Sequence, residues 1–158
     1  DGKNYHFVSD DGFSQMIDDA AFLEHANVFG KRYGTSKAEV ANKREQGQDV
    51  ILEIDWQGAQ QVRQAMPQAI SIFILPPSVE ALAQRLTSRG EDTQQSIAKR
   101  LSEAKLDISQ AQHFDYWVVN EDFDTAVQDF VAIVRTMRLQ KDVQLQHPHV
   151  QTLVHFDG

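Results

Sequence analysis

The alternation of two kinds of segment after residue 48 constrains the fold of this chain more than any other feature. Short apolar runs at residues 49–54, 69–75 and 114–119 predict strands, and the longer segments between and after them have helical periodicity. Such alternation produces right-handed crossovers and a parallel sheet with helices on both faces. The nearly continuous apolar runs "AISIFIL" and "YWVV" predict strands buried on both sides. We therefore expect an α/β fold.

Four helices are expected in this part of the chain, at residues 57–66, 79–90, 93–112 and 121–141. Pro76 and Pro77 end the strand at residues 69–75, and Ser78 caps the helix that follows. The tail after Pro148 has only a weak pattern, which predicts fraying.

The first 47 residues mix shorter elements. "NYHFVS" (residues 4–9) predicts a strand, and residues 10–26 carry apolar side chains at helical spacing. "NVFGKRYGTS" predicts a loop or a short hairpin. Ser36 and Glu39 form a capping box for a helix that Gly47 ends.

The bulk composition argues against several functional classes. A chain of 158 residues, 41% of them hydrophobic, suits one domain with a small subdomain. No apolar run approaches the roughly 20 residues of a membrane span. A net charge of −8 argues against a broad nucleic-acid-binding face, although local arginines can still bind a small anion. The absence of cysteine rules out disulfides and fits a reducing cytoplasm.

Two carboxylates stand at the end of the apolar run at residues 49–54. Glu53 and Asp55 are two residues apart, so both point to one face of a regular strand. Ligands of parallel sheets bind beyond the carboxyl ends of the strands, where Glu53, Asp55 and Asn120 are all expected. Alternatively, the strand frays at Glu53, and Asp55 caps the next helix.

Two further groups of polar residues also have alternative interpretations. "EHANVFGKRYGTS" (residues 24–36) is either a binding loop or, as composition alone favours, a solvated surface loop. Arg85 and Arg89 stand one turn apart, with Lys99 and Arg100 on the next helix. These cations either grip phosphate or lie on solvated helices with acidic partners at Glu91, Asp92 and Glu103. The histidines of "HPHVQTLVH" lack the spacing of a metal site.

Taken together, the segments "DGKNYHFV", "FLEHANVFGKRYGTS", "ILEIDWQGAQQVR", "IFILPPS", "RLTSRGEDTQQSIAKRL" and "DYWVVNEDFDTA" resemble guanylate kinases, most closely the bacterial enzymes. They follow in the family's order up to about Leu139. The resemblance implies phosphoryl transfer from ATP to GMP with Mg²⁺ as cofactor. It also implies a P-loop nucleoside monophosphate kinase fold with a GMP-binding subdomain (1–46), a core (47–80 and 106–158) and a helical lid (81–105).

The resemblance assigns roles to individual residues. Glu24 and Asp55 would read the guanine, with a further hydrogen bond from Thr35 and with Ser36 beside it. The GMP phosphate would be bound by the hydroxyls of Tyr5 and Tyr33. Glu53, where many members of the family carry Asp, would lie near the phosphates and the water shell of Mg²⁺, and no residue would bind the metal directly. The ATP side would be formed by Asn120 near the adenine and by three catalytic lid arginines: Arg85, Arg89 and Arg100.

The family's first strand and its P-loop are missing from this sequence. No G-x-x-x-x-G-K-[ST] occurs among the 158 residues, so the backbone cradle for ATP phosphates is absent. We expect the sequence to be part of a longer chain, or else a fragment that assembles unusually, and we expect the 158 residues alone to be inactive. The alternative functions are a catalytically inactive guanylate-kinase-like binding module and another nucleoside monophosphate kinase.

Overall fold

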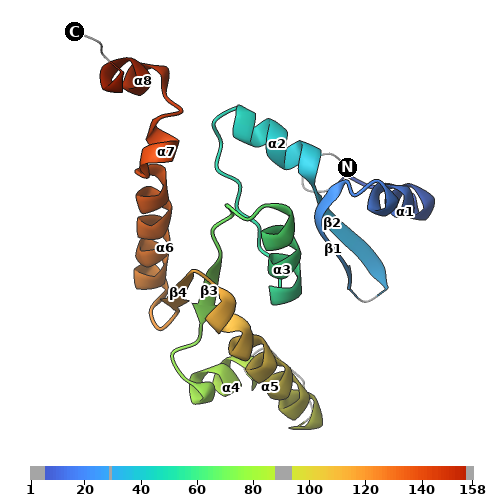
Figure 1. Cartoon of the computed structure of the whole chain (residues 1–158). Helices are drawn as coiled ribbons and strands as arrows, with labels where there is room; N and C mark the ends of the chain where they lie inside the picture. Colours follow the sequence, from blue (N-terminus) through green and yellow to red (C-terminus); the bar gives the residue numbers. More distant parts are fainter. Residues whose placement is uncertain (1–5, 29, 88–93, 156–158) are drawn as a thin grey trace. The chain divides into compact units, whose positions relative to one another are not determined.

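The computed structural model describes residues 6–28, 30–87 and 94–155 (Figure 1). The chain divides into two compact units, Asp1–Ser71 and Ile72–Gly158, and each is described by itself. Within the described ranges, no helix combines the length and the apolar character needed to cross a membrane. The finer division expected from the sequence stays a prediction: 1–46, 47–80, 81–105 and 106–158.

The first unit holds three helices and an antiparallel hairpin within its described residues. In chain order these elements are α1 (Asp10–Asp18), β1 (Phe22–Val28), β2 (Lys31–Ser36), α2 (Lys37–Glu45) and α3 (Trp56–Ala65).

Side-chain caps fix where the helices of the first unit begin. Ser9 accepts a hydrogen bond from the Gly12 N–H at 3.1 Å and starts α1. Ser36 accepts one from the Glu39 N–H at 3.4 Å and starts α2, which confirms the predicted cap. Gly47 follows the end of α2 with φ +73°, a left-handed conformation that favours glycine, so the predicted stop is also confirmed.

The hairpin corrects one expectation. Helical spacing over residues 10–26 predicted one continuous helix, but α1 ends at Asp18 and β1 begins at Phe22. Ala20, with φ +50°, interrupts the helical conformation between them. Pairing with β2 then decides the conformation of residues 22–28, because ladder hydrogen bonds outweigh a weak local periodicity.

Arg32 of β2 fastens the hairpin to α1. Its guanidinium donates to Asp10 Oδ1 at 3.0 Å and to Ser14 Oγ at 2.9 Å. It also lies 4.7 Å from the ring centroid of Phe13, which is itself buried. The cation therefore holds two sequence-distant elements together.

The core of the first unit corrects a second expectation. Leu23, Val40 and Val62 form a buried cluster, and the alternating residues of the segment before α3 pack against it: Val50, Leu52 and Ile54. Residues 49–54 therefore follow the period of a strand, but neither hydrogen-bonded sheet of the described residues includes them. A strand needs a backbone partner as well as a pattern. Residues 6–9, also expected to be in a strand, have no regular structure.

The second unit combines a parallel strand pair with helices, as Figure 1 shows from green to red. Its elements in chain order are β3 (Ile72–Leu75), α4 (Val79–Thr87), α5 (Gln94–Ser109), a 3₁₀ turn (Gln110–His113), β4 (Tyr116–Val119), α6 (Phe123–Arg138), α7 (Lys141–Gln144) and α8 (Pro148–Val154).

The parallel pairing confirms the predicted α/β organisation. Ile74 lies opposite Val118, the most buried side chain of the described chain at 2% exposure. Ser78 accepts a hydrogen bond from the Ala81 N–H at 3.1 Å, as predicted for the start of α4. Burial on both faces was wrong for this pair, because Ile74 is 49% and Trp117 58% exposed. The weak pattern after Pro148 did not predict α8, which begins there with proline in its first turn, and the predicted fraying of the tail stays a prediction.

Candidate functional site

The first part of the candidate site is a buried carboxylate on the hairpin. Glu24 lies on β1 opposite Thr35 on β2, and the Thr35 hydroxyl donates to Glu24 Oε1 at 2.6 Å. Among the described polar and charged residues, Glu24 is the buried one, at 8% exposure. Burying a carboxylate is costly unless hydrogen bonds compensate it. The hairpin therefore holds a carboxylate with one oxygen bonded and with further acceptor capacity.

Asp55 contributes a second carboxylate at the start of α3. Its Oδ1 accepts a hydrogen bond from the Gly58 N–H at 2.7 Å, so Asp55 is the N-cap of this helix. The capping interpretation of Asp55 is thus confirmed. The side chain is nevertheless exposed. One bond leaves most acceptor sites of a carboxylate unused, so capping is compatible with binding a ligand.

Gly58 lies beside both carboxylates, and the sequence analysis did not identify it as part of the site. A Cβ atom built on Gly58 would lie 3.3 Å from Asp55 Oδ1 and 3.4 Å from Glu24 Oε2. The predicted guanine-reading residues, 31 positions apart in the chain, thus flank one residue without a side chain. The available signal was a glycine in the first turn of a helix, where it is about 1 kcal/mol less favourable than alanine.

The other residues predicted for GMP have different placements. Tyr33 lies two residues before Thr35 on β2, so the two side chains share a face of the hairpin. Ser36 uses its hydroxyl to cap α2. Glu53 is exposed two residues before Asp55. Tyr5 lies outside the described residues.

The second unit brings together two residues predicted for the ATP side. Arg85, on the last turn of α4, donates from Nη2 to the backbone carbonyl of Asn120 at 2.9 Å. Asn120 in turn donates its N–H to the Leu75 carbonyl at 2.8 Å, directly after β4. The guanidinium therefore lies at the carboxyl end of the parallel pair. This is the edge where ligands of such sheets bind.

The other two predicted arginines are Arg100 and Arg89. Arg100 is exposed on α5, which lies against α4. Its neighbour Lys99 forms an ion pair with Glu103 at 3.8 Å, in agreement with the solvated-helix interpretation for that position. Arg89 lies outside the described residues. The described ranges contain no group of three or more histidine, aspartate or glutamate side chains placed to hold a metal ion.

Asp122 supplies a titratable group two residues beyond Asn120. Its carboxylate accepts from both the backbone N–H and the hydroxyl of Thr125, at 2.9 and 2.8 Å, and caps α6. The bond from the Thr125 backbone N–H, followed by the one from the Thr125 hydroxyl, lowers the pKa of Asp122 below its usual value.

Comparisons with known proteins identify the family of the chain. The family model described as guanylate kinase matches residues 1–137. A guanylate kinase from Thiobacillus denitrificans is 51% identical over 146 residues, which cover 92% of this chain and 70% of the relative. The guanylate kinase of Escherichia coli K12 is 51% identical over 145 residues, with the same two shares of 92% and 70%.

A solved structure gives the same result for the fold. The crystal structure of guanylate kinase from Anaplasma phagocytophilum superimposes with a TM-score of 0.69 at 32% sequence identity. The match covers 89% of this chain and 69% of that structure. With a family model spanning most of the sequence and relatives at half identity, the chain belongs to the guanylate kinase family.

Proposed function

We propose that the protein transfers the terminal phosphoryl group of ATP to GMP, which yields ADP and GDP. The observation that carries the proposal is the pair of carboxylates, Glu24 and Asp55, that flanks Gly58. Family membership supports the same reaction, and with it a role in purine nucleotide metabolism in the cytoplasm.

Guanine suits two carboxylates for a simple chemical reason. Its Watson–Crick edge presents two adjacent donors, a ring N–H and an exocyclic amine, and a carboxylate accepts from both at once. Adenine presents an acceptor at the equivalent ring nitrogen, so the carboxylate would face a lone pair. An unsatisfied buried polar contact of this kind costs about 1–3 kcal/mol, and more for a charged group. The pair therefore selects GMP over AMP.

Thr35 and Tyr33 extend the proposed GMP site along one face of the hairpin. The Thr35 hydroxyl orients Glu24 through its 2.6 Å bond, and its oxygen retains lone pairs that can accept from the base. Tyr33 lies on the same face with 41% of its surface exposed, and its hydroxyl would bind the phosphate together with Tyr5. We assign no general base, because phosphoryl transfer depends mainly on positioning and charge neutralisation.

The arginines of α4 and α5 would stabilise the charge on the transferring phosphoryl group. Arg85 is bonded to the Asn120 carbonyl, a neutral acceptor that it can exchange for phosphate oxygens. Arg100 and Arg89 would join it when the lid closes over ATP, and Asn120 would lie by the adenine. Closure also excludes water from the reacting groups.

Mg²⁺ is the cofactor that the proposal implies. Glu53 fits it, because an exposed carboxylate offers hard oxygen acceptors for the water molecules bound to Mg²⁺. Asp55 is assigned to the guanine, so we assign the water shell of the ion to Glu53. When bound, the ion neutralises developing charge on the phosphates.

A titration of the native protein tests the proposed base selectivity. Calorimetry should detect GMP binding with little or no AMP binding, and Asp55→Asn should remove the GMP signal. Equal binding of the two nucleotides would overturn the proposal. Binding of neither would favour the catalytically inactive binding module, against which the matches to curated guanylate kinases argue.

The 158 residues by themselves provide a second test. Because their sequence contains no G-x-x-x-x-G-K-[ST] motif, we propose that this segment, produced alone, has no measurable kinase activity. A coupled assay of ADP release with GMP and ATP checks this, on protein whose intact mass is confirmed. Turnover by that material would contradict the proposal.

A further inference from the structure

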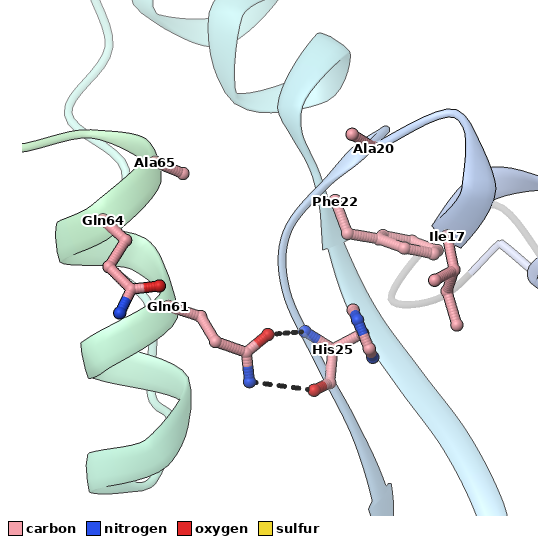
Figure 2. Close-up of a pocket in the computed structure, with 7 residues that line it drawn as sticks. All are labelled: Ile17, Ala20, Phe22, His25, Gln61, Gln64 and Ala65. Atoms are coloured by element: carbon pink, nitrogen blue, oxygen red, sulfur yellow. Dashed lines mark hydrogen bonds between the residues drawn. The ribbon is translucent and has the colours of Figure 1, made fainter.

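A glutamine on α3 is bonded twice to one residue of β1. The Gln61 side chain accepts from the His25 N–H at 3.0 Å and donates to the His25 carbonyl at 3.1 Å. Figure 2 shows both bonds, which join the middle of the helix to the strand. Both partners are partly buried.

These two hydrogen bonds, called the clamp below, satisfy backbone groups on the open edge of the hairpin. In an antiparallel pair, alternate residues direct both backbone groups away from the partner strand. His25 is such a residue, because its N–H and its carbonyl both bond Gln61. The side-chain amide therefore takes the place that a neighbouring strand would have on this edge.

The clamp acts immediately beside the buried carboxylate. Glu24 precedes His25, and the register of the hairpin shifts between Phe22 and Glu24, so the ladder is irregular just before the carboxylate. An irregular ladder holds a strand less firmly than a regular one. The helix that carries Gln61 also begins at the Asp55 cap and contains Gly58. The two bonds thus link the backbone of one carboxylate to the helix of the other.

We infer that Gln61 is a positioning residue for base selectivity, which sets the separation between Glu24 and Asp55. The inference rests on the proposed recognition of guanine by these carboxylates. Gln61 would set this separation of the two carboxylates without contacting the base. Successive side chains of a strand point to opposite faces, so the side chain of His25 lies on the face of the hairpin opposite to that of Glu24. The cleft on that side is lined by Ile17, Ala20, Phe22, His25, Gln61 and Gln64 (Figure 2).

The test uses Gln61→Met in the native protein, because methionine keeps the length of the side chain and removes both hydrogen bonds. Loss of the clamp should raise KM for GMP by roughly tenfold and leave KM for ATP unchanged. The preference for GMP over inosine monophosphate, which lacks the exocyclic amine, should fall. Amide hydrogen exchange at His25 should accelerate in the same variant.

Gln64→Met is the matched control. Gln64 lies one turn further along α3 and lines the same cleft, and within the described part of the chain no hydrogen bond joins it to β1. This variant should keep the KM values and the base preference of the native protein. If Gln61→Met does not fold, Gln61→Leu carries the test with the same expected rise, since leucine also fills the space of the side chain and removes both hydrogen bonds.

The outcomes separate this inference from the proposed function. A drop in melting temperature with unchanged KM for GMP would overturn it and leave Gln61 as a structural contact. A parallel rise of KM for GMP and ATP would overturn it as well. Failure of the proposed function would show in the unmodified protein, as a lack of preference for GMP over AMP, and the inference would then fail with it.

Discussion

Thr35 donates its hydroxyl hydrogen to Glu24 across the hairpin at 2.6 Å, and Glu24 is the buried charged residue of the described chain. The bond occupies one oxygen of the carboxylate and orients the other. In a site that reads a planar base, this orientation decides whether two donors can be accepted together. The hairpin thus presents a charge in one defined direction.

Replacing Thr35 tests the importance of that orientation. Thr35→Val keeps the shape of the side chain and removes the donor, so Glu24 loses its bonded partner. A bond to a charged group contributes about 1.5–3 kcal/mol, and KM for GMP should rise about 10- to 100-fold with KM for ATP unchanged. Thr136→Val is the control, because the Thr136 hydroxyl donates to a carbonyl within its own helix, at 2.8 Å. Equal losses for both substrates would contradict the role.

Two substitutions of Asp55 can separate its role as a helix cap from its proposed role in recognising guanine. Asparagine is as good an N-cap as aspartate, so Asp55→Asn should retain the melting temperature and lose GMP binding. Asp55→Ala should lose both, with a cost to stability of about 0.5–2 kcal/mol. Thermal melting and steady-state kinetics on the two variants check this. Retained GMP use in Asp55→Asn would leave Asp55 as a helix cap alone.

Gly58→Ala should interfere with the carboxylate pair more than with the fold. The new Cβ would lie 3.2 Å from Ile54 Cβ and close to both carboxylates, while alanine favours the helix by about 1 kcal/mol. We expect a higher KM for GMP at nearly constant stability.

Gly12→Ala is a close control for that change. Gly12 also lies in the first turn of a helix and donates its N–H to the capping side chain, here Ser9. Its Cβ would meet Ser9 Oγ at 3.2 Å, and apart from its two chain neighbours no described carboxylate lies within 4 Å of it. A KM for GMP that rises equally in both glycine variants would point to a general effect on the fold.

Arg85 should affect turnover more than substrate affinity. Arg85→Lys keeps the charge but loses the planar, bidentate geometry that suits phosphate oxygens, and we expect kcat to fall by roughly 100-fold. Arg63→Lys is the control, since Arg63 bonds Ser71 at 2.7 Å in the first unit. Single-turnover kinetics distinguish chemistry from product release. An unchanged kcat would remove Arg85 from the proposed catalytic group.

The lowered pKa of Asp122 predicts a dependence of stability on pH. Its folded pKa lies below the usual value of 3.8, so its contribution is present above that value and is lost as pH falls through the folded pKa. Asp122→Ala should therefore lower the melting temperature at pH 7 and matter less towards pH 2. Melting curves of both proteins across this range check the sign. A difference that grows in acid would contradict it.

Local chemistry made much of the fold predictable. Ser36, Ser78 and Gly47 act at the helix ends where their side-chain and backbone properties place them. The parallel pair of apolar strands was also expected, and it is confirmed in β3 and β4. These features depend on a few neighbouring residues, so a sequence pattern contains most of the information.

Strand pairing, and the proximity of residues far apart in the chain, were harder to predict from the sequence. Residues 49–54 have the alternation of a strand, but no strand of the described chain pairs with them. The segment expected to be helical extended to residue 26, but residues 22–28 pair with β2 as a strand. Glu24, Thr35 and Asp55 were chosen through the resemblance, and their meeting at Gly58 depends on a three-dimensional approach that no local pattern encodes. The roles of these residues stay predictions.

The register of the hairpin has a consequence for how this sequence can vary. Glu24 opposes Thr35 because a fixed length of chain separates them. A one-residue slip in the pairing of the two strands would move every side chain of β2 to the other face, and the threonine hydroxyl would leave the carboxylate. The surroundings of the buried carboxylate therefore depend on how the turn sets the pairing of the two strands.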